Sequence, residues 1–203
     1  MERFEQIRSL AVPLLAANVD TDIITPMQRL TGANARPLAD YAFEAWRYDD
    51  GNADSGAPRP DFPLNDPRYS GARILLTGEN FGCGSSRESA PQALHDLGLR
   101  CLIGTSFGDI FFNNCFQRGI LPIVVDAGTL DRLVADPGPL TVDLATTTVR
   151  TSDGAAIRFA VNPLRRESLL EGLDDIALTG KREALIAAFQ DRDRTDRPWV
   201  YAP

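Results

Sequence analysis

The sequence predicts an α/β domain with a parallel βαβαβ core, additional strands and C-terminal helices. Three observations support this prediction. Residues 73–126 alternate apolar strand patterns with helical patterns, which is typical of parallel strands joined by right-handed crossovers. Asp153-Gly154 separates two strand-like runs, a strong hairpin signal. Residues 164–172 and 181–193 have helical periodicity.

The segment before the core is expected to be irregular. Residues 9–15 are expected to form a strand, followed by a polar turn at 18–26, a loop at 27–37 and a short helix at 38–47. Residues 49–71 are rich in Asp, Gly and Pro. They also contain Phe62, Leu64 and Tyr69, which favour a loop held on the surface over a free linker.

The core and the C-terminal part follow in order. The expected core strands are 73–79, 100–104 and 120–126, and the expected helices between them are 87–98 and 106–119. Ser106 is a candidate N-cap for the second helix. One or two helical turns at 130–136 precede the hairpin strands, 140–151 and 155–161. We expect residues 1–203 to form a single domain with a solvated tail at 191–203.

Composition excludes several functions. The chain has 203 residues, a net charge of −7, one histidine and three cysteines. A single histidine, His95, cannot supply a two-histidine metal site. The acidic balance argues against a nucleic-acid partner, and no apolar run approaches the roughly 20 residues of a membrane span. Three cysteines form no even disulfide framework and the N-terminus does not resemble a signal peptide, so we expect a cytoplasmic location.

The sharpest motif is Gly82-Cys83-Gly84-Ser85-Ser86-Arg87-Glu88, between a strand and a helix start. Backbone amides at a helix N-terminus bind anions, and an adjacent arginine adds a bidentate donor for a carboxylate or phosphate. The alternative is a structural turn in which Ser86 caps the helix. The motif matches neither a P-loop, nor a dinucleotide fingerprint, nor a nucleophile elbow.

Residues 79–88, ENFGCGSSRE, resemble the signature of the 3-isopropylmalate dehydratase small-subunit family, in the aconitase superfamily. The resemblance continues in 17–26 (ANVDTDIITP), 42–48 (AFEAWRY), 106–122 (SFGDIFFNNCFQRGILP) and 164–179 (LRRESLLEGLDDIALT). It therefore covers nearly the whole chain in order.

The resemblance implies a swivelling β/β/α domain, like the aconitase C-terminal domain. It implies a hydro-lyase that removes and re-adds water on a small hydroxy-dicarboxylate, active only with a large subunit in a heterodimer or heterotetramer. A 4Fe-4S cluster is expected on that large subunit, with no cofactor and no metal ligand in this chain. The leading substrate is 2-isopropylmalate, isomerised to 3-isopropylmalate in leucine biosynthesis.

By the motif match, Ser85 is the proton-abstracting base and Arg87 a substrate-carboxylate ligand. Gly84 and Ser86 are expected to contact the substrate, and Asp22 matches an acidic active-site position. A helix N-terminus and an adjacent arginine would lower the cost of forming a serine alkoxide. Without the family, Asp22 would be interpreted as an Asx-turn residue.

Three cysteines could in principle hold a cubane with one open iron. However, Cys101 begins an expected buried strand and Cys115 lies in a helix among phenylalanines, so we expect both thiols to be buried and inert. Cys83 lies in the motif itself, where a helix N-terminus can increase thiol reactivity.

The chain departs from the family pattern in two places. Ser89 stands where the family has a histidine. In the loop after Pro26, the family arginine that reaches the substrate falls on Ala35, which leaves Arg36 as the main replacement and Arg29 as a weaker one. The Ser89 change is expected to alter hydrogen-bond support around the site, and the loop change keeps open an alternative substrate such as citramalate, dimethylmalate or homoaconitate. A non-catalytic binding module and a phosphate-binding protein are the further alternatives.

Overall fold

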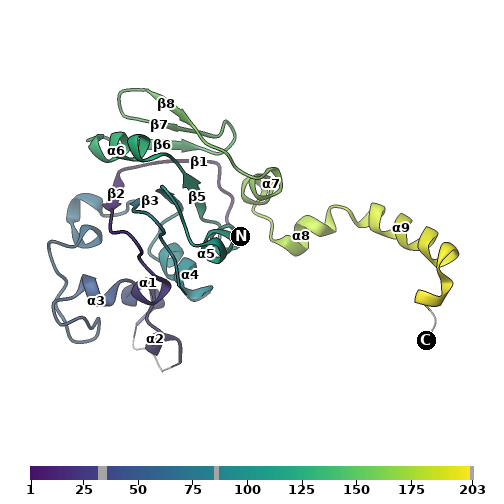
Figure 1. Cartoon of the computed structure of the whole chain (residues 1–203), viewed down its shortest axis with the longest axis horizontal. Coiled ribbons are helices and arrows are strands. Elements are labelled where there is room, and N and C mark those ends of the chain that lie inside the picture. Colours follow the sequence, from purple (N-terminus) through teal and green to yellow (C-terminus); the bar gives the residue numbers. More distant parts are fainter. Residues whose placement is uncertain (32–35, 85–86, 202–203) are drawn as a thin grey trace.

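The computed structural model describes residues 1–31, 36–84 and 87–201. Its described strands form two four-stranded sheets (Figure 1). The strands are β1 (Gln6–Ser9), β2 (Ala11–Leu14), β3 (Ile74–Thr77), β4 (Cys101–Gly104), β5 (Leu121–Val124), β6 (Leu140–Asp143), β7 (Thr148–Arg150) and β8 (Ala156–Arg158). The α-helices are α1 (Thr21–Ile24), α2 (Gln28–Thr31), α3 (Glu44–Arg47), α4 (Ser89–Asp96), α5 (Asp109–Gln117), α6 (Ala127–Ala135), α7 (Pro163–Glu171), α8 (Asp175–Gly180) and α9 (Glu183–Asp196). Short 3-10 turns lie at Leu38–Tyr41, Pro63–Asn65, Pro67–Tyr69 and Pro198–Val200.

The parallel sheet has the order β2-β3-β4-β5, with α4 and α5 in the crossovers after β3 and β4. Every residue of β3 and β4 is buried. Strands covered on both faces need continuous apolar sequence rather than alternation, which is the pattern these segments have. The predicted βαβαβ core is confirmed.

The second sheet is antiparallel and has the order β1-β6-β7-β8. The predicted hairpin joins β7 to β8, where Gly154 adopts a φ of +90°. The expected strand 9–15 is confirmed as β2, whereas β1, which directly precedes it and belongs to the other sheet, was not predicted. The expected strand 140–151 is interrupted by a turn, in which Asp143 accepts a hydrogen bond of 2.9 Å from the Thr146 amide.

The layers follow from the alternation of side chains along the parallel strands. Leu75 and Leu102 face an apolar cluster shared with α1, α4 and part of α5. Ile74 and Ile103 face the opposite cluster, which includes residues of the antiparallel sheet. The parallel sheet therefore lies between the antiparallel sheet and a helical layer (Figure 1). This is the β/β/α arrangement that the resemblance implied.

Two helix predictions differ in detail. The expected helix 38–47 is split because Phe43 adopts a left-handed conformation with a φ of +59°. Helix α5 begins after Gly108, without a side-chain cap, so the predicted N-cap role of Ser106 is wrong. The Ser106 hydroxyl instead accepts a hydrogen bond of 2.8 Å from the Asn80 amide. That contact ties together the segments that follow β3 and β4.

The C-terminal part projects from the three layers as an arm formed by α8 and α9 (Figure 1). Apolar side chains of α9 are exposed, among them Leu185, Ile186 and Phe189. Phe62, from the 49–71 segment, is buried in the cluster on the helical side of the parallel sheet. Within the described residues, no helix is long and apolar enough to cross a membrane.

Candidate active site

The segments that follow β2, β3 and β4 continue side by side beyond the ends of the strands. The Gly82 amide donates to the Val19 carbonyl at 2.7 Å, and the Thr21 amide donates to the Cys83 carbonyl at 3.0 Å. On the other side, the Gly108 amide donates to the Phe81 carbonyl at 2.9 Å. The motif after β3 is therefore the middle of three paired segments at the carboxyl ends of parallel strands, the usual place for a ligand site in such a sheet.

Gly82 is required at its position by both conformation and space. Its φ is +73°, and a Cβ there would lie 2.2 Å from Cγ of Phe111. The Phe111 ring is itself buried and makes an edge-to-face contact with Phe81, their centroids 5.6 Å apart. The rings of Phe81 and Phe111 therefore pack against the start of the motif.

Asp22 is positioned by the cap of helix α1. Asp20 is the N-cap residue, and its Oδ1 accepts a hydrogen bond of 2.7 Å from the Ile23 amide. The turn-closing role considered for Asp22 thus belongs to Asp20. Asp22 lies in the first turn of α1, with 53% of its side chain exposed.

Arg87 meets Asp22 across the two loops. Its Nη1 donates to Asp22 Oδ1 in an ion pair, and only 11% of the Arg87 side chain is exposed. Gly84, in the same motif, adopts a φ of +86° beside Asp20. The structure therefore brings Asp22, Gly84 and Arg87 to one edge of the sheet, directly before α4. Ser85 and Ser86 lie outside the described residues, and their roles stay predictions.

Arg29 is enclosed in a polar network. Its guanidinium donates to both carboxylate oxygens of Glu44, at 2.7–3.1 Å, and to Asp54 at 2.7 Å. It also donates to Asn52 at 2.9 Å and lies 4.1 Å from the centroid of the Tyr41 ring. The hydrogen bonds that Arg29 donates to Glu44 are the main factor that raises the pKa of Arg29. These contacts indicate a structural role for Arg29 rather than the weaker substrate-binding role considered above.

Arg36 has a different environment. It is exposed, and its backbone amide donates to the Tyr41 hydroxyl at 3.2 Å. Its positive charge is near enough to Asp54 to contribute to the lowered pKa of that carboxyl, after larger contributions from Tyr41 and Arg29. Of the two candidate arginines, Arg36 is the one whose side chain is exposed to a ligand.

No motif or spacing marks the acidic members of this network, Glu44 and Asp54, as functional residues. Glu44 was assigned to a helix, and Asp54 lay in a segment notable only for its polar composition. What could have been noticed is a glutamate among the apolar residues of 42–46.

The cysteines and the histidine lie as expected. Cys101 and Cys115 are buried, and burial raises the pKa of both thiols. Cys83 is half-buried in the motif. His95 lies in α4, half-buried beside Asp96. In the part of the chain that the structure describes, no group of three or more His, Cys, Asp or Glu side chains could hold a metal ion.

Ser89 opens helix α4 in an unusual state. Its hydroxyl oxygen is buried, and among the described residues it has no hydrogen-bond partner. Its carbonyl accepts a hydrogen bond of 3.4 Å from the Thr25 hydroxyl. Ser89 therefore contacts the α1 side of the site through its main chain rather than through its hydroxyl.

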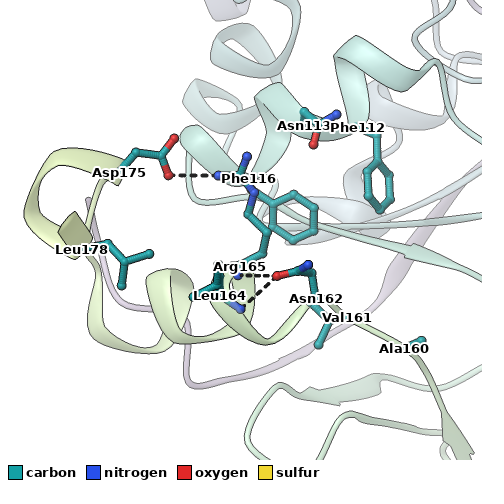
Figure 2. Close-up of a pocket in the computed structure, with 10 residues that line it drawn as sticks. All are labelled: Phe112, Asn113, Phe116, Ala160, Val161, Asn162, Leu164, Arg165, Asp175 and Leu178. Atoms are coloured by element: carbon teal, nitrogen blue, oxygen red, sulfur yellow. Dashed lines mark hydrogen bonds and ion pairs between the residues drawn. The ribbon is translucent and has the colours of Figure 1, made fainter. Parts of the chain in front are cut away.

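A cavity among the described residues lies away from this site (Figure 2). It is an open groove of about 750 Å³ between α5, residues 160–165 and α8. Phe112, Phe116 and Leu164 contribute apolar surface, and Arg165 pairs with Asp175 at 3.0 Å on its edge. None of the described site residues lines it. The candidate site is thus formed by loops at the edge of the sheet and lies outside this cavity.

Known proteins resemble this chain over almost all of its length. The Aconitase C-terminal domain family model matches residues 1–128. A 3-isopropylmalate dehydratase small subunit from Azorhizobium caulinodans is 47% identical, over 98% of this chain and 100% of that protein. Proteins of the same name from Rhodopseudomonas palustris and Nitrobacter hamburgensis are each 46% identical, with the same coverage.

The fold also matches a solved structure. A crystal structure of 3-isopropylmalate dehydratase from Methanocaldococcus jannaschii superposes with a TM-score of 0.62. The match covers 90% of this chain and 98% of the other, at 22% sequence identity. At that identity the likeness establishes the fold alone.

Proposed function

Because the chain belongs to the family of 3-isopropylmalate dehydratase small subunits, we propose that it is the small subunit of a heteromeric hydro-lyase. This enzyme isomerises 2-isopropylmalate to 3-isopropylmalate by dehydration and rehydration, in leucine biosynthesis and in the cytoplasm. The observation that carries the proposal is the position of the described motif residues, Gly82–Gly84 and Arg87, at the carboxyl ends of the parallel strands, with Arg87 paired to Asp22.

The proposal places the 4Fe-4S cluster on a large partner subunit, in a heterodimer or heterotetramer. Two of the three thiols of this chain are buried in apolar surroundings that disfavour the thiolate form that a cluster requires. When bound on the partner, the cluster supplies Lewis-acid activation of the substrate hydroxyl and one carboxylate. This chain supplies the groups on the other side of the substrate.

Ser85 is assigned the proton transfer by its place in the motif. The proton beside a carboxylate is weakly acidic, so the base must be strong when it acts. Arg87 adjoins the serine pair in sequence, and its guanidinium presents several donors in a fixed plane, suited to a carboxylate. Asp22 engages one end of that guanidinium and orients it. We assign Gly84 and Ser86 to substrate contact and Arg36 to a substrate carboxylate.

The test is reconstitution with the large subunit under anaerobic conditions, followed by turnover of 2-isopropylmalate. Ser85→Ala should lower kcat by roughly 10²–10⁴-fold, the usual contribution of a general acid or base. Arg87→Lys should raise KM, because lysine does not reproduce the planar fork. Arg118→Lys is the control: Arg118 is half-buried, its only ion pair among the described residues is with Glu88 at 3.5 Å, and a lysine keeps the charge, so this change should leave both constants unaltered. A wild-type complex inactive on every hydroxy-dicarboxylate would refute the proposal.

A second candidate is a small subunit that acts on a different substituted malate. The observation that favours it is the loop after Pro26, where Ala35 stands in place of the family arginine and Arg29 is held by Glu44 and Asp54. Comparing kcat/KM for isopropylmalate, citramalate, dimethylmalate and homoaconitate in the same complex separates the two candidates.

A further inference from the structure

One small group of side chains holds both ends of the segment 29–36. We call Tyr41, Glu44 and Asp54 the Tyr41 clamp. Arg29, at the start of the segment, donates to Glu44 and Asp54 and stacks on the Tyr41 ring. Arg36, at its end, donates its backbone amide to the Tyr41 hydroxyl. The Tyr41 hydroxyl in turn donates to Asp54 Oδ1 at 2.9 Å.

The clamp is anchored in the body of the protein. Tyr41 is fully buried, and only 9% of the Glu44 side chain is exposed. Glu44 also accepts a hydrogen bond of 3.2 Å from the Ala53 amide, which ties in the segment after α3. Charged hydrogen bonds in such a covered setting are stronger than those between neutral groups, and removing one partner leaves a buried charge unpaired. These buried and charged contacts therefore hold the side chains of the clamp in one arrangement.

The clamp also connects to the candidate site. The Phe43 amide, between Tyr41 and Glu44, donates to the Ile24 carbonyl at 3.1 Å. Ile24 is the last residue of α1, the helix whose first turn carries Asp22. The backbone that supports Arg36 is thereby hydrogen-bonded to the helix that supports the Arg87–Asp22 pair. Meanwhile the Arg36 side chain is exposed.

We propose that Tyr41 and Asp54 are positioning residues that fix the main chain at Arg36, so that its guanidinium can bind a substrate carboxylate. The inference rests on the proposed function and deepens it. It accounts for an arginine that stands one position later than in the family pattern. Such an arginine needs a contact that fixes its main chain, and the Tyr41 hydroxyl provides one. Without that hydrogen bond, Arg36 samples more orientations and pays more entropy on binding.

The kinetic test compares two buried tyrosines in the reconstituted complex. Tyr41→Phe removes the hydroxyl that holds Arg36 and keeps the ring beneath Arg29. Tyr48→Phe is the matched control, because its hydroxyl is also buried but donates to the Asp40 carbonyl at 3.0 Å. Tyr41→Phe should raise KM by roughly 3–10-fold, the value of one hydrogen bond, with kcat within about twofold. Tyr48→Phe should leave KM within about twofold of wild type.

A double-mutant cycle separates positioning from general stability. If Tyr41 acts through Arg36, Tyr41→Phe should have no further effect on KM in an Arg36→Ala background. Additive effects of the two substitutions would overturn the proposal, as would equal effects of Tyr41→Phe and Tyr48→Phe. In either case the wild-type complex would still be active, so the proposed function would stand.

A second measurement needs no activity. In the isolated full chain, the Arg36 amide should exchange its hydrogen for deuterium faster in Tyr41→Phe than in wild type, by roughly 3–10-fold if one hydrogen bond is lost. Tyr48→Phe should leave that exchange rate unchanged. Unaltered exchange at Arg36 in Tyr41→Phe would refute the proposal even if the complex were inactive on all malates.

Discussion

Replacing Gly82 with alanine tests how the motif is held against the helical layer. Two costs add at this position. A φ of +73° is unfavourable for any residue with a Cβ, by roughly 1–2 kcal/mol. In addition, the new Cβ would lie 2.2–2.6 Å from three atoms of the Phe111 ring. That ring contacts Phe81 edge to face and stacks on Phe107, with centroids 6.4 Å apart, so it has little room to move.

Overpacking of this kind costs about 1–3 kcal/mol, so the total loss for Gly82→Ala is about 2–5 kcal/mol. In a chain of this size each kcal/mol lowers Tm by about 2–4 °C. Gly98→Ala is the matched control. Gly98 has a φ of +91° but nothing within 4 Å of the new Cβ, so it incurs only the conformational cost. The Tm of Gly98→Ala should fall by about 2–8 °C, and that of Gly82→Ala by distinctly more.

The assay is denaturant unfolding of both variants, together with a double-mutant cycle that combines Gly82→Ala with Phe111→Leu. A smaller side chain at 111 leaves room for the alanine methyl. The double variant should therefore be more stable than the sum of the single effects predicts, by about 1 kcal/mol or more. The reasoning fails if Gly82→Ala and Gly98→Ala lose the same stability, or if the effects of Gly82→Ala and Phe111→Leu are additive.

Four further outcomes are expected. Ser89→Ala should raise the free energy of unfolding by about 1 kcal/mol, because it removes a buried hydroxyl without a described partner; a loss measured by denaturant unfolding would contradict this. A thiol reagent should modify only Cys83 quickly in the folded chain and all three cysteines after denaturation, as counted by mass spectrometry; fast labelling of Cys101 or Cys115 would be inconsistent with their burial. Removing residues 182–203 should shift Tm by less than about 2 °C, because the side chains of α9 are exposed apart from that of Asp193. Asp193 accepts hydrogen bonds only from Arg197 and Tyr201 among the described residues, and both lie within the removed segment. The hydrogen bond from Tyr41, followed by that from Arg29, lowers the pKa of Asp54 below its ordinary value of 3.8. The ionised carboxylate therefore stabilises the fold at pH values above 3.8, and this stabilisation is lost as the pH falls through the lower pKa of the folded state. Asp54→Asn should therefore be less stable than wild type at neutral pH, with a difference that shrinks in acid.

Much of the fold could be predicted because its signals are local. Strands β3 and β4 are buried on both faces, so their sequences are continuously apolar. The hairpin after β7 has Asp153-Gly154 at its turn. The split between β1 and β2 has no such signal. Both strands are extended, and only their partners, β6 and β3, place them in different sheets. The boundary between β1 and β2 is therefore set by strands that lie far away in the sequence.

The site could be predicted only where family motifs cover it. Asp22 and Arg87 were both named, and the structure joins them. Glu44 and Asp54 were not named, because their role comes from a contact with Arg29 across 15 and 25 residues. Neither residue has a spacing that marks it. A salt bridge between loops is visible only once the loops are placed.

The arrangement of charges explains why this chain is half of a site. In the proposed function, a dicarboxylate would be bound by cations from two loops, Arg87 after β3 and Arg36 after α2. Both loops connect to helix α1, through Asp22 and through the Ile24 carbonyl. Arg87 and Asp22 lie at the edge of the parallel sheet, whereas the cavity of about 750 Å³ opens beside α5 and α8. A substrate held at that edge has cationic groups on one side only. In the proposed enzyme, the groups that activate the leaving hydroxyl come from the large partner subunit, so a chain with one histidine and two deeply buried thiols could still take part in a dehydration.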